Sequence, residues 1–196
     1  MRNKLKILSI AILTIGLLLK PLSVGFCELG ENFNAPKEAI DFYKQQLENE
    51  PDNVELLIKL GNSYLEGGSY LDALEIFERV TGLRPSDFRG HANLAWLYNK
   101  VGAQNLSIKE YDVAIPLLEQ ELKNDSSDMA TQRTLFSAIS DYARVLEKTD
   151  MPDKAITQFQ KLRQLTEDNP ALKDSLPVDI IPRIERKIES LRNKAI

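Results

Sequence analysis

The feature that most constrains the fold of this chain is a repeat with a period of 34 residues. Residues 36–51 and 70–85 share a small residue, an aromatic residue and a closing proline at matching places: Ala39 and Ala73, Tyr43 and Phe77, Pro51 and Pro85. A fixed period of this length is the signature of a solenoid. Each unit of a solenoid keeps an uncovered apolar face and must stack on a neighbour.

Residues 54–85 form one complete unit with the pattern of two helices. Apolar residues recur at helical spacing in two runs: Val54, Leu57, Ile58, Leu60 and Leu65, then Leu71, Leu74, Ile76, Phe77 and Val80. Gly67 and Gly68 separate the runs, because glycine tolerates the positive φ of a tight helix end. Gly61 and Ala73 are small where the helices must approach closely. The unit is therefore predicted to be a helical hairpin.

This unit resembles the tetratricopeptide repeat (TPR). The signature of that family asks for a large apolar residue, Leu-Gly, Tyr, Ala, an aromatic residue and a closing proline. In this chain the places hold Leu57, Leu60, Gly61, Tyr64, Ala73, Phe77 and Pro85. The resemblance implies an all-α superhelix of stacked hairpins, whose first helices line a concave surface.

The rest of residues 36–172 is read by the same pattern. Residues 36–53 match only a second helix and are predicted to be a half-repeat, followed by full repeats at about 54–87, 88–127 and 128–170. The small positions Ala73, Ala114 and Ala155 are 41 residues apart, seven more than the first period. Seven residues are about two helical turns, so the later helices are expected to be longer with their apolar faces in phase.

Two further elements are expected in the second half of the chain. An interior proline costs about 3 kcal/mol in a helix, so at Pro116 we expect a kink or a helix that begins only a few residues earlier. Residues 173–196 are predicted to form a polar-backed capping helix. Its apolar stripe consists of Ile180, Ile184, Ile188 and Leu191.

Residues 1–27 are predicted to be a signal peptide, followed by a linker at 28–35. Three basic residues precede a 13-residue apolar run over 7–19, which is shorter than the about 20 residues that cross a bilayer. Small residues permit a cut before Glu28 or before Phe26. We expect an exported, periplasmic or extracellular chain. The alternatives are an anchor formed by the uncleaved leader and lipidation at Cys27, which Phe26 disfavours.

The charge of the chain disfavours nucleic acid as a partner. The sequence has 25 basic and 29 acidic residues, and the leader contains four basic residues and no acidic one. Without the leader, 21 basic residues face 29 acidic ones, a net charge of −8. Nucleic-acid binding needs basic surface to neutralise phosphates. Cys27 is the single cysteine, so neither an internal disulfide nor a cysteine-based metal site is expected.

No motif in the sequence points to catalysis, to a cofactor or to a bound metal. His91 is the only histidine and stands where Leu57 stands one repeat earlier, which is a packing position. Gly67 and Gly68 belong to a hairpin turn and do not form a phosphate-binding loop. We expect a protein that is not an enzyme and uses no cofactor.

The resemblance implies that partner proteins bind on the concave surface. The residues expected there are Ile58, Asn62, Leu65, Arg89, Asn93, Trp96, Lys100 and Arg144. Asn62 and Asn93 stand at the asparagine places of the carboxylate clamp, with which some members of the family grip a peptide C-terminus. Its lysine and arginine places hold Ile58, Ser137 and Asp141. Without those cations, hydrogen bonding to an internal extended segment is the better hypothesis, and solvated asparagines are the alternative.

Three functions are compatible with these features. The first is an adaptor that binds an extended peptide or a helix of an envelope or secreted protein in its concave groove. The second is a periplasmic chaperone or assembly factor, and the third is a self-associating scaffold. Membrane association is expected only if the leader is retained or Cys27 is lipidated. Trp96 fits either the groove or the core.

Overall fold

The computed structural model of the chain describes residues 35–194, and every regular element within that range is a helix. The elements are α2 (Pro36–Asn49), α3 (Val54–Glu66), α4 (Tyr70–Leu83), α5 (Phe88–Lys100), α6 (Gln104–Asn124), α7 (Met129–Lys148), α8 (Pro152–Asp168), α9 (Pro170–Asp174) and α10 (Ile180–Lys194). The predicted all-α solenoid is confirmed. The predicted signal peptide and nearly all of the predicted linker lie outside the described residues.

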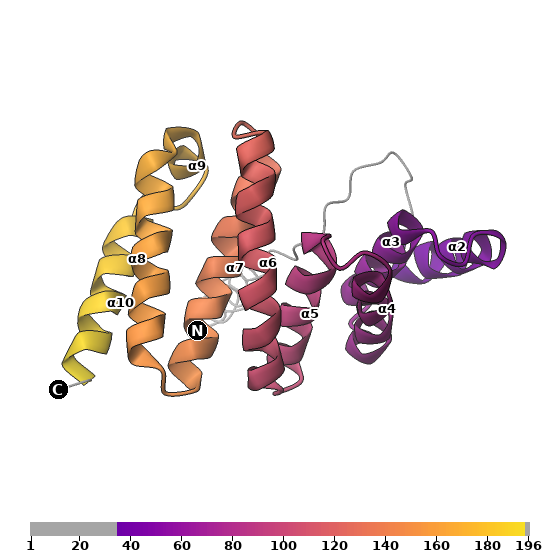
Figure 1. The fold of residues 1–196 in the computed structure, drawn as a ribbon, viewed down its shortest axis with the longest axis horizontal. Helices are drawn as coiled ribbons and strands as arrows, with labels where there is room; N and C mark the ends of the chain where they lie inside the picture. Colours follow the sequence, from indigo (N-terminus) through magenta and orange to yellow (C-terminus); the bar gives the residue numbers. More distant parts are fainter. Residues whose placement is uncertain (1–34, 195–196) are drawn as a thin grey trace, which may run out of the picture.

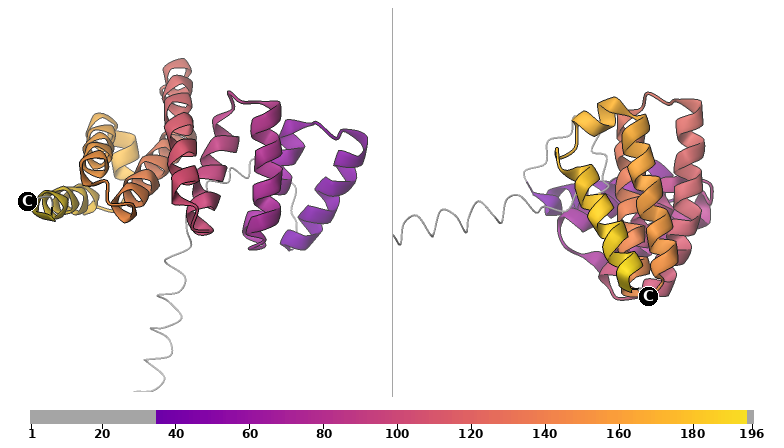
Figure 2. Two further views of the ribbon diagram at one scale, coloured as in Figure 1. Left: turned by 60° about the horizontal axis from the view of Figure 1, so that its bottom comes forward. Right: turned by 90° about the vertical axis from the view of Figure 1, so that its left-hand side faces the viewer.

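The helices stack in chain order from α2 at one end to α10 at the other (Figure 1). Helices α3 and α4, α5 and α6, and α7 and α8 pack as three hairpins. Contacts of α4 with α5 and of α6 with α7 join the hairpins to one another. Helix α2 covers α3, and α10 covers α8 at the far end (Figure 2). The chain is thus a short solenoid in which each hairpin contacts its neighbours in sequence.

The first helix of every hairpin begins at a side-chain cap. The carboxamide oxygen of Asn53 accepts from the backbone N–H groups of Glu55 and Leu56, at 3.1 and 3.2 Å. Asp87 and Asp128 cap α5 and α7 in the same way. These caps satisfy N–H groups that a helix start leaves unpaired, so the local sequence sets where α3, α5 and α7 begin.

The core depends on small residues at the helix crossings. The three alanines that mark the repeat, Ala73, Ala114 and Ala155, are fully buried. Gly61 of α3 faces the fully buried ring of Phe77 in α4, and a Cβ on that glycine would lie 2.7 Å from two ring carbons. Only glycine lets α3 approach α4 so closely, which is why the Leu-Gly pair of the repeat is needed here.

The helices of the later hairpins are longer, as the 41-residue spacing predicted. Helices α6, α7 and α8 have 21, 20 and 17 residues, whereas α3, α4 and α5 have 13 or 14. The expectation that a helix would begin shortly before Pro116 is wrong, because α6 begins at Gln104 and runs through the proline. The Pro116 ring is exposed, while Ile115 and Leu118 beside it are buried and hold the helix in place.

The closing helix α10 begins at Ile180, later than the start of the segment predicted for it. The preceding residues form the short helix α9 and a connection that contains Pro177. Proline disfavours helical geometry in the residue before it, so one continuous helix from 173 cannot form. Ile184, Ile188 and Leu191 are buried and the opposite side is exposed, as expected of a capping helix. No helix within 35–194 is both long and apolar enough to cross a bilayer.

The Gly61 contact predicts opposite effects for two glycine substitutions. Gly61→Ala should destabilise the chain by about 1–3 kcal/mol, because the added methyl group would overlap the fully buried Phe77 ring. Gly82→Ala in α4 should stabilise it by about 0.5–1 kcal/mol, because nothing lies within 4 Å of the added methyl group and alanine favours a helix. Urea unfolding followed by circular dichroism measures both. Equal effects of the two substitutions would contradict the assigned packing.

Candidate functional site

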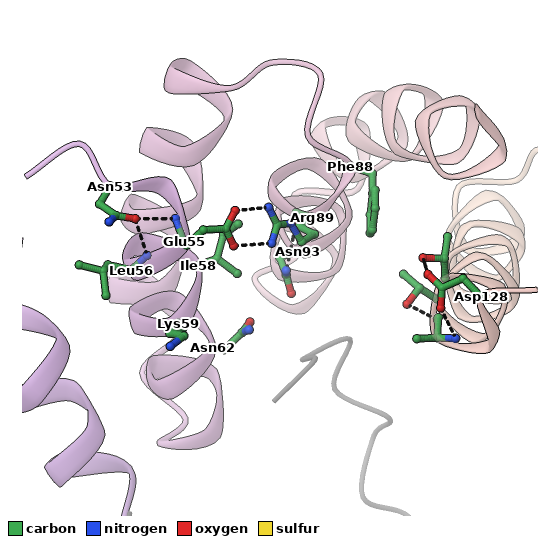
Figure 3. A pocket seen from close by; sticks show the side chains of 13 residues that line it. Asn53, Glu55, Leu56, Ile58, Lys59, Asn62, Phe88, Arg89, Asn93 and Asp128 are labelled. Carbon is green, nitrogen blue, oxygen red and sulfur yellow. Dashed lines mark hydrogen bonds and ion pairs between the residues drawn. The ribbon is translucent and has the colours of Figure 1, made fainter. Parts of the chain in front are cut away.

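The first helices of the three hairpins enclose a pocket of about 510 Å³, here called the asparagine pocket. Its lining side chains come from the start of α3, α5 and α7 (Figure 3): Asn53, Glu55, Leu56, Ile58, Lys59, Asn62, Phe88, Arg89, Asn93, Asp128, Ala130, Thr131 and Thr134. Four of the predicted groove residues therefore lie together: Ile58, Asn62, Arg89 and Asn93. The volume is in the range of ordinary ligand pockets.

A second pocket of about 770 Å³ lies further along α5 and α7 and is also lined by the connection between α9 and α10. It is here called the basic pocket, and its lining consists of Trp96, Asn99, Lys100, Arg133, Phe136, Ser137, Ser140, Asp141, Arg144, Lys148, Ser175, Leu176 and Pro177. Three predicted groove residues, Trp96, Lys100 and Arg144, are among them. Leu65 lines neither pocket, because it packs against the amino-terminal core.

The two pockets follow one another along the same helix faces. On α5, Asn93 belongs to the first pocket, and Trp96 and Lys100 belong to the second. On α7, Thr134 lies in the first pocket and Ser137 in the second. Steps of three and four residues stay on one side of a helix. The two pockets therefore form one surface, here called the inner groove.

The two asparagines in the groove differ in how far they are already hydrogen-bonded. Asn93 is only 3% exposed, and its side-chain amide donates to the Arg89 carbonyl oxygen at 2.8 Å. Asn62 is half-buried, and its Oδ1 is buried without a hydrogen-bond partner in the described chain. Figure 3 shows both side chains directed toward the pocket. Asn62 is thus the asparagine with unused hydrogen-bonding capacity.

The residues of α7 that lie near Asn62 and Asn93 are not Ser137 and Asp141, which the comparison with the carboxylate clamp indicated. Thr131 and Thr134 share the asparagine pocket with Asn62 and Asn93, whereas Ser137 and Asp141 line the basic pocket. The added turns of α7 place its first turns beside the asparagines. None of the α7 residues in the asparagine pocket is a cation, so the clamp is incomplete in this register also.

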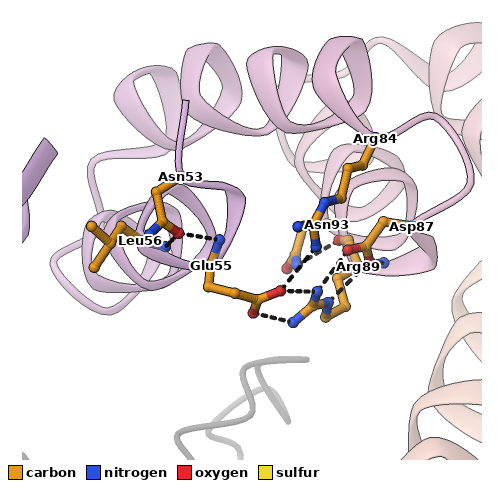
Figure 4. A network of polar contacts seen from close by, with 7 residues as sticks. All are labelled: Asn53, Glu55, Leu56, Arg84, Asp87, Arg89 and Asn93. Carbon is orange, nitrogen blue, oxygen red and sulfur yellow. Dashed lines mark hydrogen bonds and ion pairs between the residues drawn. The ribbon is translucent and has the colours of Figure 1, made fainter. Parts of the chain in front are cut away.

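Arg89 acts as a brace between the first two hairpins. Its guanidinium donates to the Asp87 carboxylate at 2.6 and 2.9 Å, and to both Glu55 oxygens at 2.7 Å (Figure 4). Glu55 stands on α3, so this bidentate pair ties α3 to α5. The guanidinium of Arg89 is thus already paired with two carboxylates of the same chain. Arg89 therefore positions α3 against α5, and its predicted contact with a partner stays a prediction.

The brace also shifts the ionisation of its carboxylates. Hydrogen bonds from Arg89 hold the pKa of Glu55 below its ordinary value, against a smaller opposing effect of burial. Burial alone would raise the pKa of Asp87, but the hydrogen bonds and charge of Arg89 together outweigh it and leave that pKa lowered. Both carboxylates are consequently charged at neutral pH and paired with Arg89.

Trp96 belongs to the groove and to the core at once. It is partly buried against the amino-terminal core, and its ring meets the Tyr70 ring edge-on at 5.6 Å. The Lys100 Nζ lies 4.8 Å from the centre of its ring, a cation–π contact. Because Trp96 also lines the basic pocket, it contacts both the groove and the core.

Sequence reasoning missed several residues of the basic pocket. Arg133, Phe136 and Lys148 lie on the groove side of α7, where helical spacing from Arg144 would have indicated them. Leu176 and Pro177 carry no such signal, because they belong to an irregular connection. Residues 35–194 hold no group of three or more side chains suited to binding a metal ion.

The sequence profile described as Tetratricopeptide repeat matches residues 33–98, which include the complete hairpin α3–α4. Residues 33–98 thus carry the sequence pattern of tetratricopeptide repeats. The chain is 26% identical over 144 residues to Superkiller protein 3 of Schizosaccharomyces pombe, a match that covers 73% of the chain and 10% of that protein. The chain thus spans about a tenth of the length of this relative.

Solved structures show the same fold. The crystal structure of MamA superposes with a TM-score of 0.55 at 20% sequence identity, over 81% of this chain and 84% of the other. PcrH, crystallised in complex with the chaperone binding region of PopD, gives a TM-score of 0.55 at 18% identity, over 74% and 96%. At these identities the comparison supports the solenoid architecture alone.

Replacement of Arg89 should destabilise the chain at neutral pH, and this loss of stability should decrease as the pH falls. Arg89→Met should lower the free energy of unfolding by about 1–2 kcal/mol at pH 7, because a half-buried ion pair is lost. Carboxyl groups with lowered folded pKa values stabilise the fold above their ordinary pKa near 4, and this contribution is lost as the pH falls. The difference from the native chain should therefore shrink between pH 4 and pH 2.

Urea unfolding at several pH values measures this difference. Arg192→Met is the matched control, because Arg192 is exposed on α10 and makes no ion pair with a described residue. A loss of stability at Arg89 that stays constant with pH would show that the side chain acts through packing of its stem and not through its carboxylate partners.

Proposed function

We propose that this chain is an exported adaptor that binds a partner protein by taking an extended peptide or a helix into the inner groove. The observation that carries the proposal is the unused hydrogen-bonding capacity of Asn62 inside a pocket shared by three helices. A side-chain amide both donates and accepts, and a turn of its plane exchanges the two ends. It can therefore pair with either backbone group of a bound segment.

The rest of the asparagine pocket favours a bound segment that is neutral. The Arg89 guanidinium is taken by Glu55 and Asp87, and the Asp128 carboxylate accepts from Thr131 Oγ1 at 2.6 Å and from the Ala130 N–H. Two cations, Lys59 and Arg89, and two carboxylates, Glu55 and Asp128, line this pocket, so its lining has no net charge. Backbone hydrogen bonding, at about 1 kcal/mol net per bond, is the interaction that this pocket supports best.

The family and one of its similar structures support a protein partner. TPR folds are in general non-catalytic modules for protein–protein interaction, and we propose no enzymatic role for this chain. PcrH was crystallised with the chaperone binding region of PopD, so a solenoid of this kind can take up a segment of another protein. That complex also favours a second candidate function, a chaperone that holds a client before assembly.

The two candidate functions differ in what the groove accepts. An adaptor binds one defined partner in its folded state, whereas a chaperone binds segments that the client exposes only before folding. Binding of one partner in native and in urea-unfolded form, compared by isothermal titration, separates the two. Tighter binding of the native partner supports the adaptor, and binding of the unfolded form alone supports the chaperone.

The groove predicts that Asn62→Ala weakens partner binding by about fivefold, the equivalent of one lost hydrogen bond of about 1 kcal/mol. Partners are captured from an envelope extract on the immobilised chain, and the affinity of the captured protein is then measured for each variant. Asn105→Ala is the matched control, because Asn105 is exposed on α6 and lines neither pocket. Unchanged affinity in Asn62→Ala would remove Asn62 from the binding site.

Export is proposed from the basic start and apolar run of residues 1–27. Ile12→Arg with Ile15→Arg should keep the chain inside the cell at full length, because each arginine costs about 2.5–3.5 kcal/mol in an apolar segment. Leu17→Ile should leave export intact. Cell fractionation and mass spectrometry of the native chain measure the outcome. An intracellular native chain of full mass would refute export, and a full-length chain in the membrane would indicate an uncleaved anchor.

A further inference from the structure

The basic pocket reverses the charge of the rest of the chain. Four cations line it, Lys100 on α5 and Arg133, Arg144 and Lys148 on α7, against the single carboxylate of Asp141. The lining therefore carries a net charge of +3, within a chain whose formal charge is −4. Such a concentration of one sign in a hollow focuses the field and attracts the opposite charge.

Most of these cations lack a carboxylate partner. The Arg144 guanidinium pairs with Asp141. Lys100 lies over the Trp96 ring, and the Lys148 Nζ donates to the carboxamide oxygen of Asn99 at 3.3 Å, so neither of their charges is neutralised. The remaining cation of the lining, Arg133, is exposed and makes no ion pair with any residue of 35–194. Three cations are thus available to acidic groups from outside.

Apolar side chains lie between the cations. Trp96 and Phe136 are partly buried and come from α5 and α7, and Leu176 and Pro177 of the following connection also line the pocket. A fully hydrated anion gains nothing from such walls, whereas a peptide with an apolar side chain can bury it there. Trp and Arg are also among the residue types that most often supply the binding energy of protein interfaces.

We propose that the basic pocket binds an acidic segment of a partner protein, in which Asp or Glu residues flank one apolar anchor. This inference rests on the proposed peptide-binding function and specifies the chemistry of the partner. The three available cations would pair with the carboxylates, and Trp96 and Phe136 would contact the anchor. The asparagine pocket, whose lining has no net charge, would hold a neighbouring neutral part of the same segment.

The spacing of the cations sets the length of the segment. Arg133 and Lys148 are 15 residues apart on α7, which corresponds to about 22 Å along the helix. An extended chain advances about 3.3 Å per residue, so about seven residues span this distance. Nucleic acid also carries negative charge, but it would bring many phosphates against the acidic remainder of this chain. A short acidic peptide avoids that repulsion.

The single tryptophan of the chain makes the pocket directly observable. Trp96 lines the pocket, so its fluorescence reports occupancy without a label. The probes are an eight-residue peptide with four Glu residues around a central Leu, and its counterparts with Gln or Lys in place of Glu. At low salt the purified chain should bind the Glu peptide at least tenfold more tightly than the Gln peptide and should not bind the Lys peptide. Added salt should reduce the difference.

A pair of variants tests whether the pocket itself selects for acid. Arg133→Gln with Lys148→Gln should reduce the affinity for the Glu peptide about tenfold and leave the affinity for the Gln peptide unchanged. Lys109→Gln with Lys154→Gln is the matched control, because both residues are exposed, line neither pocket and remove the same charge. The control should bind as the native chain does. Circular dichroism melts verify that all variants remain folded.

The outcomes separate this inference from the proposed function. Equal affinity for the Glu and Gln peptides, or an equal loss in both double variants, would overturn the acid selectivity and leave peptide binding intact. Failure of all three peptides to change the Trp96 signal or the measured heat of binding would overturn both proposals. Tighter binding of a single-stranded oligonucleotide than of the Glu peptide would also overturn the inference, because the pocket would then select phosphate.

Discussion

Each hairpin of this chain leaves part of its apolar surface uncovered, and the next hairpin in the sequence covers it. Two glycines show how close the resulting contacts are. Gly61 faces the Phe77 ring within the first full hairpin, and a Cβ on Gly90 would lie 2.9 Å from Val80 Cγ1 at the junction of α4 with α5. The first contact holds α3 close to α4 within its hairpin, and the second holds α5 close to α4 at the junction, so the second hairpin packs tightly against the first.

The first helices of the hairpins together produce a surface which no neighbouring hairpin covers. Polar and charged side chains on this surface form hydrogen bonds and ion pairs either within the chain or with a partner. The two halves of the inner groove differ in this respect. In the asparagine pocket Arg89 is taken by Glu55 and Asp87, so the charged groups serve the junction between hairpins. In the basic pocket Arg133 has no such carboxylate. The same residue type thus stabilises the fold in one half and remains available for binding in the other.

Much of the fold could be predicted from the sequence, because the repeat shows in the spacing of apolar and small residues along the chain. The alanines at 73, 114 and 155 marked the crossings of the second helices, and their 41-residue spacing predicted the longer helices. The late helix start considered for Pro116 was wrong, since the cost of one interior proline is local while the packing that retains α6 involves buried residues on both sides of it. Tertiary contacts outweighed a local preference there.

The candidate site was less predictable, because it depends on which residues of different helices face each other. The bidentate pair joins Glu55 and Arg89 across 34 residues, and no local pattern shows that it uses up the arginine. The clamp alignment assigned Ser137 and Asp141 to the asparagines, but α7 meets them with its first turns. The register of one helix against another is set by its crossing, which periodicity alone does not define.

The lengthening of α7 links the stretched repeat to the proposed selectivity. A helix of 13 residues, the length of α3 and α5, would begin at Met129 and end at Asp141. The residues beyond that point include Arg144 and Lys148, two of the four cations in the basic pocket. The added turns therefore do more than keep the apolar face in phase with its neighbours. They bring the end of α7 to the last turn of α5, where Lys148 contacts Asn99, and so supply one of the three cations available to an acidic partner.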